Sequence, residues 1–309
     1  KAADWGQITW VYMGPDQATP PGLPMWEWCT VPENQLQHQH KAVYECNYMQ
    51  ALEGELDTTH VYFLHSRLDP TNTEGYGLYA KDRAAKLEVM DTDYGVLYGA
   101  RRFEDTELIY WRTTQYVFPI YGMFPGGGDD GTVPLSIYLP VDDHTTIHWG
   151  LRWHPSKAIS QDGGHPLTHN FDEKGRLVGG LGPLKPEQMG KVYSKWYPVA
   201  DADNDFCIDR DVQRDKSYSG IGTVRLQDYA LIYSMGPIMD RTKEHLGTAD
   251  ATIIRVRRRL LAAAEALRDK GTPPPASTDP SLYAVRSCQG NLPLGEDWRT
   301  RFADWHNCR

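Results

Sequence analysis

Between residues 86 and 153 the chain repeats short runs of aromatic and β-branched residues, separated by turn-forming residues. The runs read KLEVMDTDYGVLYGARR, ELIYWRTTQYVFPIYGMF, VPLSIYLPVDD and TTIHWGLRWHP. Strands of this length and spacing predict one antiparallel sheet. The first residues carry a similar alternation, WGQITWVYMGP, which predicts a single strand that ends at a Gly-Pro turn.

Two stretches outside this β-rich region favour helix. In AVYECNYMQALEGELDTTHVYFLH (residues 42–65) the first part is strand-like, and helix-favouring Ala, Leu, Glu and Met follow from Asn47 onward. The stretch TADATIIRVRRRLLAAAEALRDKG (248–271) offers Thr or Asp as an N-cap and stops at Gly271, with prolines directly beyond. The predicted fold class is therefore α+β: a curved antiparallel sheet packed against helices.

Composition and charge exclude some partners. The 309 residues carry a formal net charge of −9, which argues against a nucleic acid or an anionic membrane. Four arginines of the second helix, Arg255, Arg257, Arg258 and Arg259, are interpreted as a solvated face rather than a nucleic-acid surface. No apolar run approaches the roughly 18 residues that a membrane-spanning helix needs.

The cysteines give no sign of a metal motif. They are odd in number and scattered, and none forms a C-x-x-C or C-x-H pair, which argues against a zinc ribbon or an iron–sulfur site within this chain. The five are Cys29, Cys46, Cys207, Cys288 and Cys308. Reduced thiols in a cytoplasmic protein are the simplest interpretation.

His60 and His65 lie five residues apart in the first helix-favouring stretch. On an ideal helix such positions differ by about 140° around the axis, so the rings converge only if the helix bends or ends between them. Asp57 precedes His60 by one turn, where its carboxylate is positioned to accept a hydrogen bond from a ligand imidazole. Two packed core histidines and two ligands of one metal both remain open on spacing alone.

A third ligand is sought in the acidic stretch ADADNDFCIDRDVQRD (residues 200–215). Asp205 is flanked by apolar residues and is predicted to border a buried strand, and Asp209 is the second choice. Two histidines and one carboxylate form the facial triad of non-haem Fe(II), which leaves coordination positions open for oxygen.

Other polar residues within β-rich stretches are candidates for a pocket, with packing or solvent exposure as the simpler interpretation. His38 and His40 are expected to share one face of a strand. His148 and His154 flank a second strand. An arginine among aromatic residues is suited to bind a carboxylate through two hydrogen bonds. That third candidate group consists of Trp111, Arg112 and Gln115.

Four ordered motifs resemble the catalytic part of Rieske non-haem iron oxygenases, above all the phthalate 4,5-dioxygenase-like group that includes aromatic O-demethylases. They are CNYMQALEGELDTTHVYFLH, NDFCIDRDVQR, GPIMDRTKEHLGTAD and RRRLL. The resemblance implies a helix-grip fold in which His60, His65 and Asp205 hold a mononuclear Fe(II). It also implies that Asp57 is the acid through which an electron arrives from a cluster on a neighbouring subunit.

The resemblance exposes one departure. In that family an N-terminal domain binds a [2Fe–2S] Rieske cluster through two Cys and two His, and this chain contains neither C-x-H nor C-x-x-H. A cluster domain is therefore expected to precede Lys1 in a longer chain. Residues 1–30 would then be the end of that domain with a linker, 31–275 the mononuclear-iron catalytic domain, and 276–309 an irregular C-terminal tail. Glu53 stands where some relatives carry an asparagine near the iron.

The implied function is that of an aromatic-ring dioxygenase or a monooxygenase of the O-demethylase type. It would oxidise an aromatic, carboxylated substrate with O2 and with electrons from an NAD(P)H-dependent reductase. The implied protein is a cytoplasmic homotrimer or hexamer. Two other functions remain open: a non-enzymatic module that carries a hydrophobic ligand, which needs no converging ligands and no iron, and a metal-dependent hydrolase, which needs a general base beside the metal.

Overall fold

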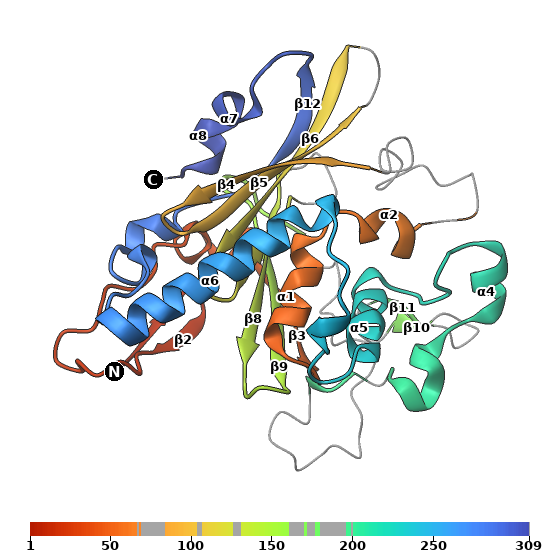
Figure 1. Cartoon of the computed structure of the whole chain (residues 1–309), viewed down its shortest axis with the longest axis horizontal. Coiled ribbons are helices and arrows are strands. Elements are labelled where there is room, and N and C mark those ends of the chain that lie inside the picture. The colour runs from red at the N-terminus through yellow and green to blue at the C-terminus, as the bar shows by residue number, and fades with distance from the viewer. Residues whose placement is uncertain are drawn as a thin grey trace.

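An antiparallel sheet of eight strands forms the centre of the molecule (Figure 1). The computed structural model describes residues 1–66, 68, 84–103, 107–125, 131–160, 170–171, 177–179, 196–198 and 200–308. The strands are β3 (Leu36–Tyr44), β4 (Lys86–Thr92), β5 (Gly95–Phe103), β6 (Leu108–Val117), β7 (Tyr121–Met123), β8 (Val133–Pro140), β9 (Thr146–Trp153) and β12 (Gln289–Pro293). Seven lie in the order β3-β9-β8-β7-β6-β5-β4, and β12 pairs with β6. The predicted antiparallel sheet and the α+β class are confirmed.

The opening segment differs from its prediction of a single strand. It forms a hairpin of β1 (Ala2–Trp5) and β2 (Ile8–Val11). Gly6 and Gln7 have φ angles of 60° and 61°, and two successive left-handed residues make the tight turn that joins antiparallel strands. Alternation alone does not reveal such a turn. A second small pair, β10 (Asn170–Phe171) with β11 (Leu177–Gly179), lies in the stretch of residues 155–200, which is rich in Gly, Pro, His and Lys.

Helices α1 (Tyr48–Leu56) and α6 (Ala251–Lys270) cover one face of the sheet (Figure 1). Helix α5 (Val224–Ser234) packs against α1, and two short helices, α2 (His60–Leu64) and α4 (Arg210–Asp215), lie on the same side of the molecule as α5. Helix α1 begins where the sequence predicts, because the Asn47 side chain caps it by accepting the backbone N–H of Met49. Helix α6 ends at Gly271, whose φ of 65° suits a residue without a Cβ. Both predicted helix starts and the predicted stop are confirmed.

Several single turns of 3-10 helix connect these elements. They are η1 (Glu27–Cys29), η2 (Glu33–Gln35), η5 (Ala202–Cys207), η6 (Arg241–Lys243), η7 (Thr248–Asp250), η8 (Pro275–Ser277) and η9 (Pro280–Tyr283). None of the helices in the described ranges is both long enough and apolar enough to cross a membrane.

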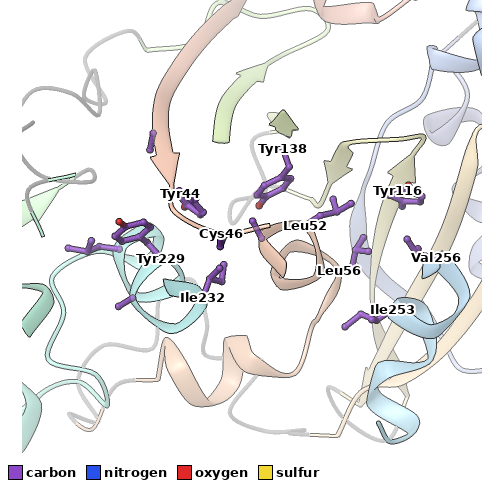
Figure 2. Packing of buried hydrophobic residues seen from close by; sticks show 14 of the residues in the cluster. Tyr44, Cys46, Leu52, Leu56, Tyr116, Tyr138, Tyr229, Ile232, Ile253 and Val256 are labelled. Carbon is purple, nitrogen blue, oxygen red and sulfur yellow. The ribbon is translucent and has the colours of Figure 1, made fainter. Parts of the chain in front are cut away.

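The main core lies between the helices and the sheet (Figure 2). Leu52 and Leu56 of α1 and Val256 of α6 contact the sheet residues Tyr116 and Tyr138 there, all of them almost fully buried. Burying apolar side chains of this size is worth roughly 1.5–3 kcal/mol each. This packing fixes α1, and with it the segment that follows α1, against the sheet.

The opposite face of the sheet is covered as well. Trp26 and Trp28 pack there with Trp153 of β9, each with no exposed surface. Arg286 forms an ion pair with Glu27, and Glu27 also accepts the indole N–H of Trp153 at 2.8 Å. Residues near both ends of the described chain therefore close this side of the sheet.

Residues 276–309 were predicted to be an irregular tail, and that prediction is wrong for the part the structure describes. Strand β12 runs antiparallel to the Leu108–Arg112 part of β6, and two short helices follow, α7 (Trp298–Arg301) and α8 (Ala303–His306). Only five residues make the strand, and they include Gly, Asn and Pro, so periodicity gives no signal. The sheet edge of β6 supplies the hydrogen bonds that make it a strand.

The arginines of α6 are largely engaged within the molecule. Arg255 forms an ion pair with Asp91, and Arg259 donates to the carbonyl oxygen of Thr92 in the β4–β5 turn at 2.7 Å. Arg257 binds Glu53 of α1 through two nitrogens, at 2.6 and 2.8 Å. The charges of the helix thus serve to fix it to the sheet and to α1.

Replacing Trp298 by Ala should lower the free energy of unfolding by about 3–5 kcal/mol, because a buried aromatic side chain would leave a cavity. Trp298 is 1% exposed, its ring lies 5.6 Å from that of Trp111, and it packs so closely on Gly99 that a Cβ there would clash. Chemical denaturation measures the change. Leu294→Ala, at a side chain that is 64% exposed, is the control and should change little. A loss below about 1 kcal/mol for Trp298→Ala would contradict the assignment of this segment to the fold.

Candidate metal centre

His60 and His65 converge because the helix between them is short. Helix α1 ends at Leu56 with Asp57 as its C-cap, and α2 starts anew at His60. His65 follows the end of α2 with a non-helical backbone (φ −93°, ψ 8°). The two ring centroids are 5.1 Å apart. The break before His60 and the stop before His65 remove the angular separation that a continuous helix would impose.

The carboxylate that completes the group is Asp228 of α5. Its Oδ1 atom lies 3.5 Å from Nε2 of His60 and 3.1 Å from Nε2 of His65. One ligand atom from each of the three residues lies within 4.8 Å of the other two. The His65 side chain is 3% exposed, and those of His60 and Asp228 are 19% and 21% exposed. The group is thus largely buried.

The structure does not bring Asp205, the predicted third ligand, into this group; the carboxylate that lies there is that of Asp228. The Asp205 side chain is 75% exposed and binds Arg210 at 3.0 Å. Its backbone is left-handed (φ 52°), as are those of Phe206 and Cys207, so the predicted buried strand does not form there. Asp209, the second choice, instead caps α4 by accepting the backbone N–H groups of Asp211 and Val212.

A signal for Asp228 was present in the sequence, although it is weaker than a run of acids. The stretch VRLQDYALIYS is a buried helix in which Gln227 and Asp228 interrupt apolar residues. Clustered acids are usually solvated, whereas a lone acid in an apolar helix must find a partner. Asp205 is the predicted ligand because apolar residues flank it in sequence, which indicates a buried strand. Those residues do not form a strand in the structure.

Hydrogen bonds orient both imidazoles. Asp57 Oδ2 lies 3.2 Å from Nδ1 of His60, and Gln227 Oε1 lies 2.6 Å from Nδ1 of His65. Gln227 is itself held, because its amide group donates to the carbonyl oxygen of Ile221 at 2.9 Å. An acceptor at each Nδ1 favours a proton there, so Nε2, which faces Asp228, is the nitrogen of each ring that is left to bind a metal.

The electrostatics of the group favour a cation. Burial disfavours the charged form of His60, but Asp228 and Asp57 together raise the pKa of His60 to about 10. Burial likewise opposes ionisation of Asp57, yet hydrogen bonds from His60 and Thr59 lower the pKa of Asp57. The pKa of Asp228 also lies below its usual value, against the effect of burial, because of its contacts with the two imidazoles. Two carboxylates therefore surround the ring nitrogens with negative potential.

The donor set fits a divalent metal of the non-haem iron type. Two imidazole nitrogens and one carboxylate oxygen converge, both rings have their second nitrogen hydrogen-bonded, and no cysteine takes part. A set of two histidines and one carboxylate leaves further coordination positions free and is typical of Fe(II) sites that react with oxygen. The three side chains by themselves provide the donor atoms that such a metal requires.

Glu53 does not belong to this group. It lies in an ion-pair cluster with Arg241, Glu244 and Arg257, which links α1 to α6 and to the preceding turn. The Glu53 and Glu244 side chains are each 11% exposed. Glu53 thus fixes α1 from the side of α6.

The expectation that His38 and His40 share one strand face is wrong. A β-bulge between them shifts the register against β9, so they face opposite sides. His38 lies beside the rings of Trp28 and Trp149. The His40 ring lies over Gly150, where a Cβ would clash with it, and its Nε2 is 3.2 Å from Nδ1 of His148.

The remaining pocket candidates have different roles in the structure. His154 accepts the backbone N–H groups of Ser156 and Lys157 and so stabilises a turn. Gln115 donates to the carbonyl oxygen of Arg286, and Trp111 packs on Trp298, as described above, so both serve the fold. Arg112 lies over the ring of Phe124 at 5.4 Å.

Two stretches fall largely outside the described residues. The Gly-rich stretch FPGGGDDG (124–131), whose composition is typical of a turn, is described only at its two ends. Of residues 155–200, which are rich in Gly, Pro, His and Lys as in a long loop, the structure describes 155–160, 170–171, 177–179, 196–198 and 200. No pocket is assigned to either segment.

The sequence matches known proteins along most of its length. The family model described as LigXa C-terminal domain like matches residues 11–307. The chain is 32% identical over 303 residues to the 3-chlorobenzoate-3,4-dioxygenase oxygenase subunit of Comamonas testosteroni; the match covers 96% of this chain and 68% of that protein.

Two further relatives are more distant. The phthalate 4,5-dioxygenase oxygenase subunit of Pseudomonas putida is 29% identical over 286 residues, a match that covers 87% of this chain and 59% of that protein. The 5,5'-dehydrodivanillate O-demethylase oxygenase subunit of a Sphingobium species is 25% identical over 285 residues, which are 90% of this chain and 54% of that protein. The chain therefore spans between about half and two thirds of the length of these relatives.

Asp228→Asn should weaken binding of Co(II), a redox-stable substitute for Fe(II), by more than about 100-fold, because even the residues that only support metal ligands are worth about 10- to 100-fold. Asp205→Asn is the matched control and should leave the affinity unchanged. Titration of the metal-free chain by calorimetry and by the Co(II) absorption bands measures both. A loss of affinity in the Asp205 variant, or none in the Asp228 variant, would contradict the corrected assignment.

Proposed function

The chain belongs to the LigXa C-terminal domain like family and is the catalytic part of a Rieske oxygenase, and from this premise we propose that His60, His65 and Asp228 bind one Fe(II). The bound ion would supply the activation of O2 for the oxidation of an aromatic ring or of its methoxy group. The observation that carries the proposal is the convergence of two oriented imidazoles and one carboxylate within 4.8 Å.

The side chains divide the work of holding the ion. His60 and His65 would donate through Nε2, since their Nδ1 atoms face Asp57 and Gln227. Asp228 would offer an oxygen and balance one positive charge. Helix α5 carries both Asp228, a proposed ligand, and Gln227, which orients His65. Movement of that helix would therefore displace both side chains together.

Asp57 is proposed to serve electron transfer more than metal retention. It touches His60 but is not itself within the converging group, and its side chain is 22% exposed. A carboxylate in this position makes the imidazole a better donor and also reaches the surface. We infer that a cluster-bearing domain of a neighbouring subunit meets the chain here, in a homotrimer or hexamer.

The proposal extends to the longer protein. Its relatives are named for 3-chlorobenzoate, phthalate and 5,5'-dehydrodivanillate, which supports an aromatic, carboxylated substrate. The [2Fe–2S] cluster would lie in an N-terminal domain outside residues 31–275, with a reductase as the source of electrons. Dioxygenation and O-demethylation are both compatible with one Fe(II) of this type.

The other two functions receive less support. A carrier of hydrophobic ligands has no need for two imidazoles that converge on one carboxylate. A hydrolase needs a general base beside the metal, and Asp57 is already held by hydrogen bonds from the backbone of Thr59 and His60.

The function is tested by oxygen uptake. The longer protein, loaded with Fe(II) and supplied with reductase and NAD(P)H, should consume O2 only when an accepted aromatic acid or methoxyarene is added, and oxidised product should appear. His65→Ala protein is the control and should consume no O2 above background. Substrate binding without oxygen uptake at full iron content would favour the carrier instead.

Asp57→Asn in the longer protein should retain most of its iron and still accept electrons into the cluster, yet lose turnover. Asn keeps the size of the side chain and some hydrogen bonding but removes the charge. Iron analysis, cluster reduction followed by absorbance, and product formation separate the three effects. Near-normal product formation at matched iron content would show that Asp57 is structural.

A further inference from the structure

An arginine lies one turn from the proposed metal ligand Asp228. Arg225 and Asp228 are three residues apart on α5, so their side chains point about 60° apart from the same side of the helix. A guanidinium carries its charge at every physiological pH. A permanent positive charge one helical turn from a metal ligand opposes the binding of a divalent cation, and it requires compensation.

Glu55 of α1 supplies that compensation. Its Oε2 atom lies 3.4 Å from Nη1 of Arg225, and it also accepts the phenol O–H of Tyr138 at 2.7 Å. The Glu55 side chain is 4% exposed and that of Arg225 is 24% exposed. Among the described residues, Glu55 is the carboxylate that forms an ion pair with Arg225, and the second oxygen of Glu55 has no hydrogen-bond partner.

The pair contributes little to holding the two helices together. Helix α5 packs on α1 through Leu226, Tyr229 and Ile232, which belong to the same buried cluster as Leu52 and Leu56 (Figure 2). That apolar contact is extensive, whereas the ion pair is a single contact of 3.4 Å with one carboxylate oxygen left unsatisfied. Burying a charge pair is costly unless it is well hydrogen-bonded, so the pair is not explained by stability.

We propose that Glu55 neutralises Arg225 and thereby preserves the affinity of the His60–His65–Asp228 group for a divalent metal. This inference rests on the proposed metal site and adds a residue pair that lies outside the converging group of ligands. Glu55 and Arg225 act through the three ligands. Together they set the electrostatic potential at the site, and neither contributes a ligand atom.

The test is a cycle of charge-neutralising variants of this chain, each titrated with Co(II) alone. Glu55→Gln leaves Arg225 uncompensated and should weaken Co(II) binding by about tenfold, the lower range for residues that support metal ligands. Arg225→Gln leaves Glu55 uncompensated and should tighten binding. The double variant, Glu55→Gln with Arg225→Gln, should bind with nearly the original affinity. Arg225→Lys keeps the charge and should also leave it nearly unchanged.

The matched control is Glu27→Gln. It removes the same charge from another largely buried Glu–Arg pair, Glu27 with Arg286, which lies on the face of the sheet opposite the helices. This variant should lose stability in chemical denaturation without a change in Co(II) affinity. If Arg225→Gln does not fold, the double variant carries the test: it must bind Co(II) more tightly than Glu55→Gln.

Opposite effects of the two single substitutions support the inference. Weaker binding in both singles with the weakest in the double variant would overturn it, because that pattern indicates a geometric role, and so would unchanged affinity in all variants. Absence of Co(II) binding by the unmodified chain would overturn the metal site itself, and the inference with it.

Discussion

The candidate metal centre depends on the carboxylate of Asp57. One oxygen accepts the backbone N–H of Thr59 at 2.7 Å, and the other accepts that of His60 at 2.9 Å and lies beside its ring. These contacts end α1, start α2 at a new angle and orient the first imidazole. A single side chain therefore sets both the backbone break and the tautomer on which the convergence of His60 with His65 relies.

The sheet provides the rigid frame for this local arrangement. Helix α1 is held on it by apolar packing and by the phenol of Tyr98, which donates to the carbonyl oxygen of Leu56 at 2.7 Å. Arg102 of the same strand, β5, donates to the carbonyl oxygen of Thr58 at 2.9 Å. The sheet thus fixes the residues on either side of the break through these two hydrogen bonds. Helix α5 brings Gln227 and Asp228 to the histidines.

Charge pairs have different tasks on the two sides of α1. Glu53 faces α6 and shares two arginines with Glu244, which ties helices together at a partly exposed site where solvent weakens each pair. Glu55 faces α5 and the sheet, where it is almost fully buried and pairs with Arg225, which lies one helical turn from Asp228. Two acids that are two residues apart in sequence therefore differ in function because they point to opposite sides of one helix.

Short stretches of sequence are enough to predict the individual helices and strands. The strands between 86 and 153, the start of α1 at Asn47 and the end of α6 at Gly271 all follow from patterns within a few residues. Hydrophobic periodicity, caps and turn residues act over that range, so they can be read without the fold.

The tertiary structure decided which distant residues meet. Asp228 lies more than 160 positions beyond the histidines in the sequence, and nothing local separates it from the more conspicuous Asp205. The bulge that sends His38 and His40 to opposite faces depends on the register of β3 against β9, and β12 becomes a strand only beside β6. These outcomes depend on contacts between residues that are far apart in sequence. Such contacts stabilise the protein only once the core has formed.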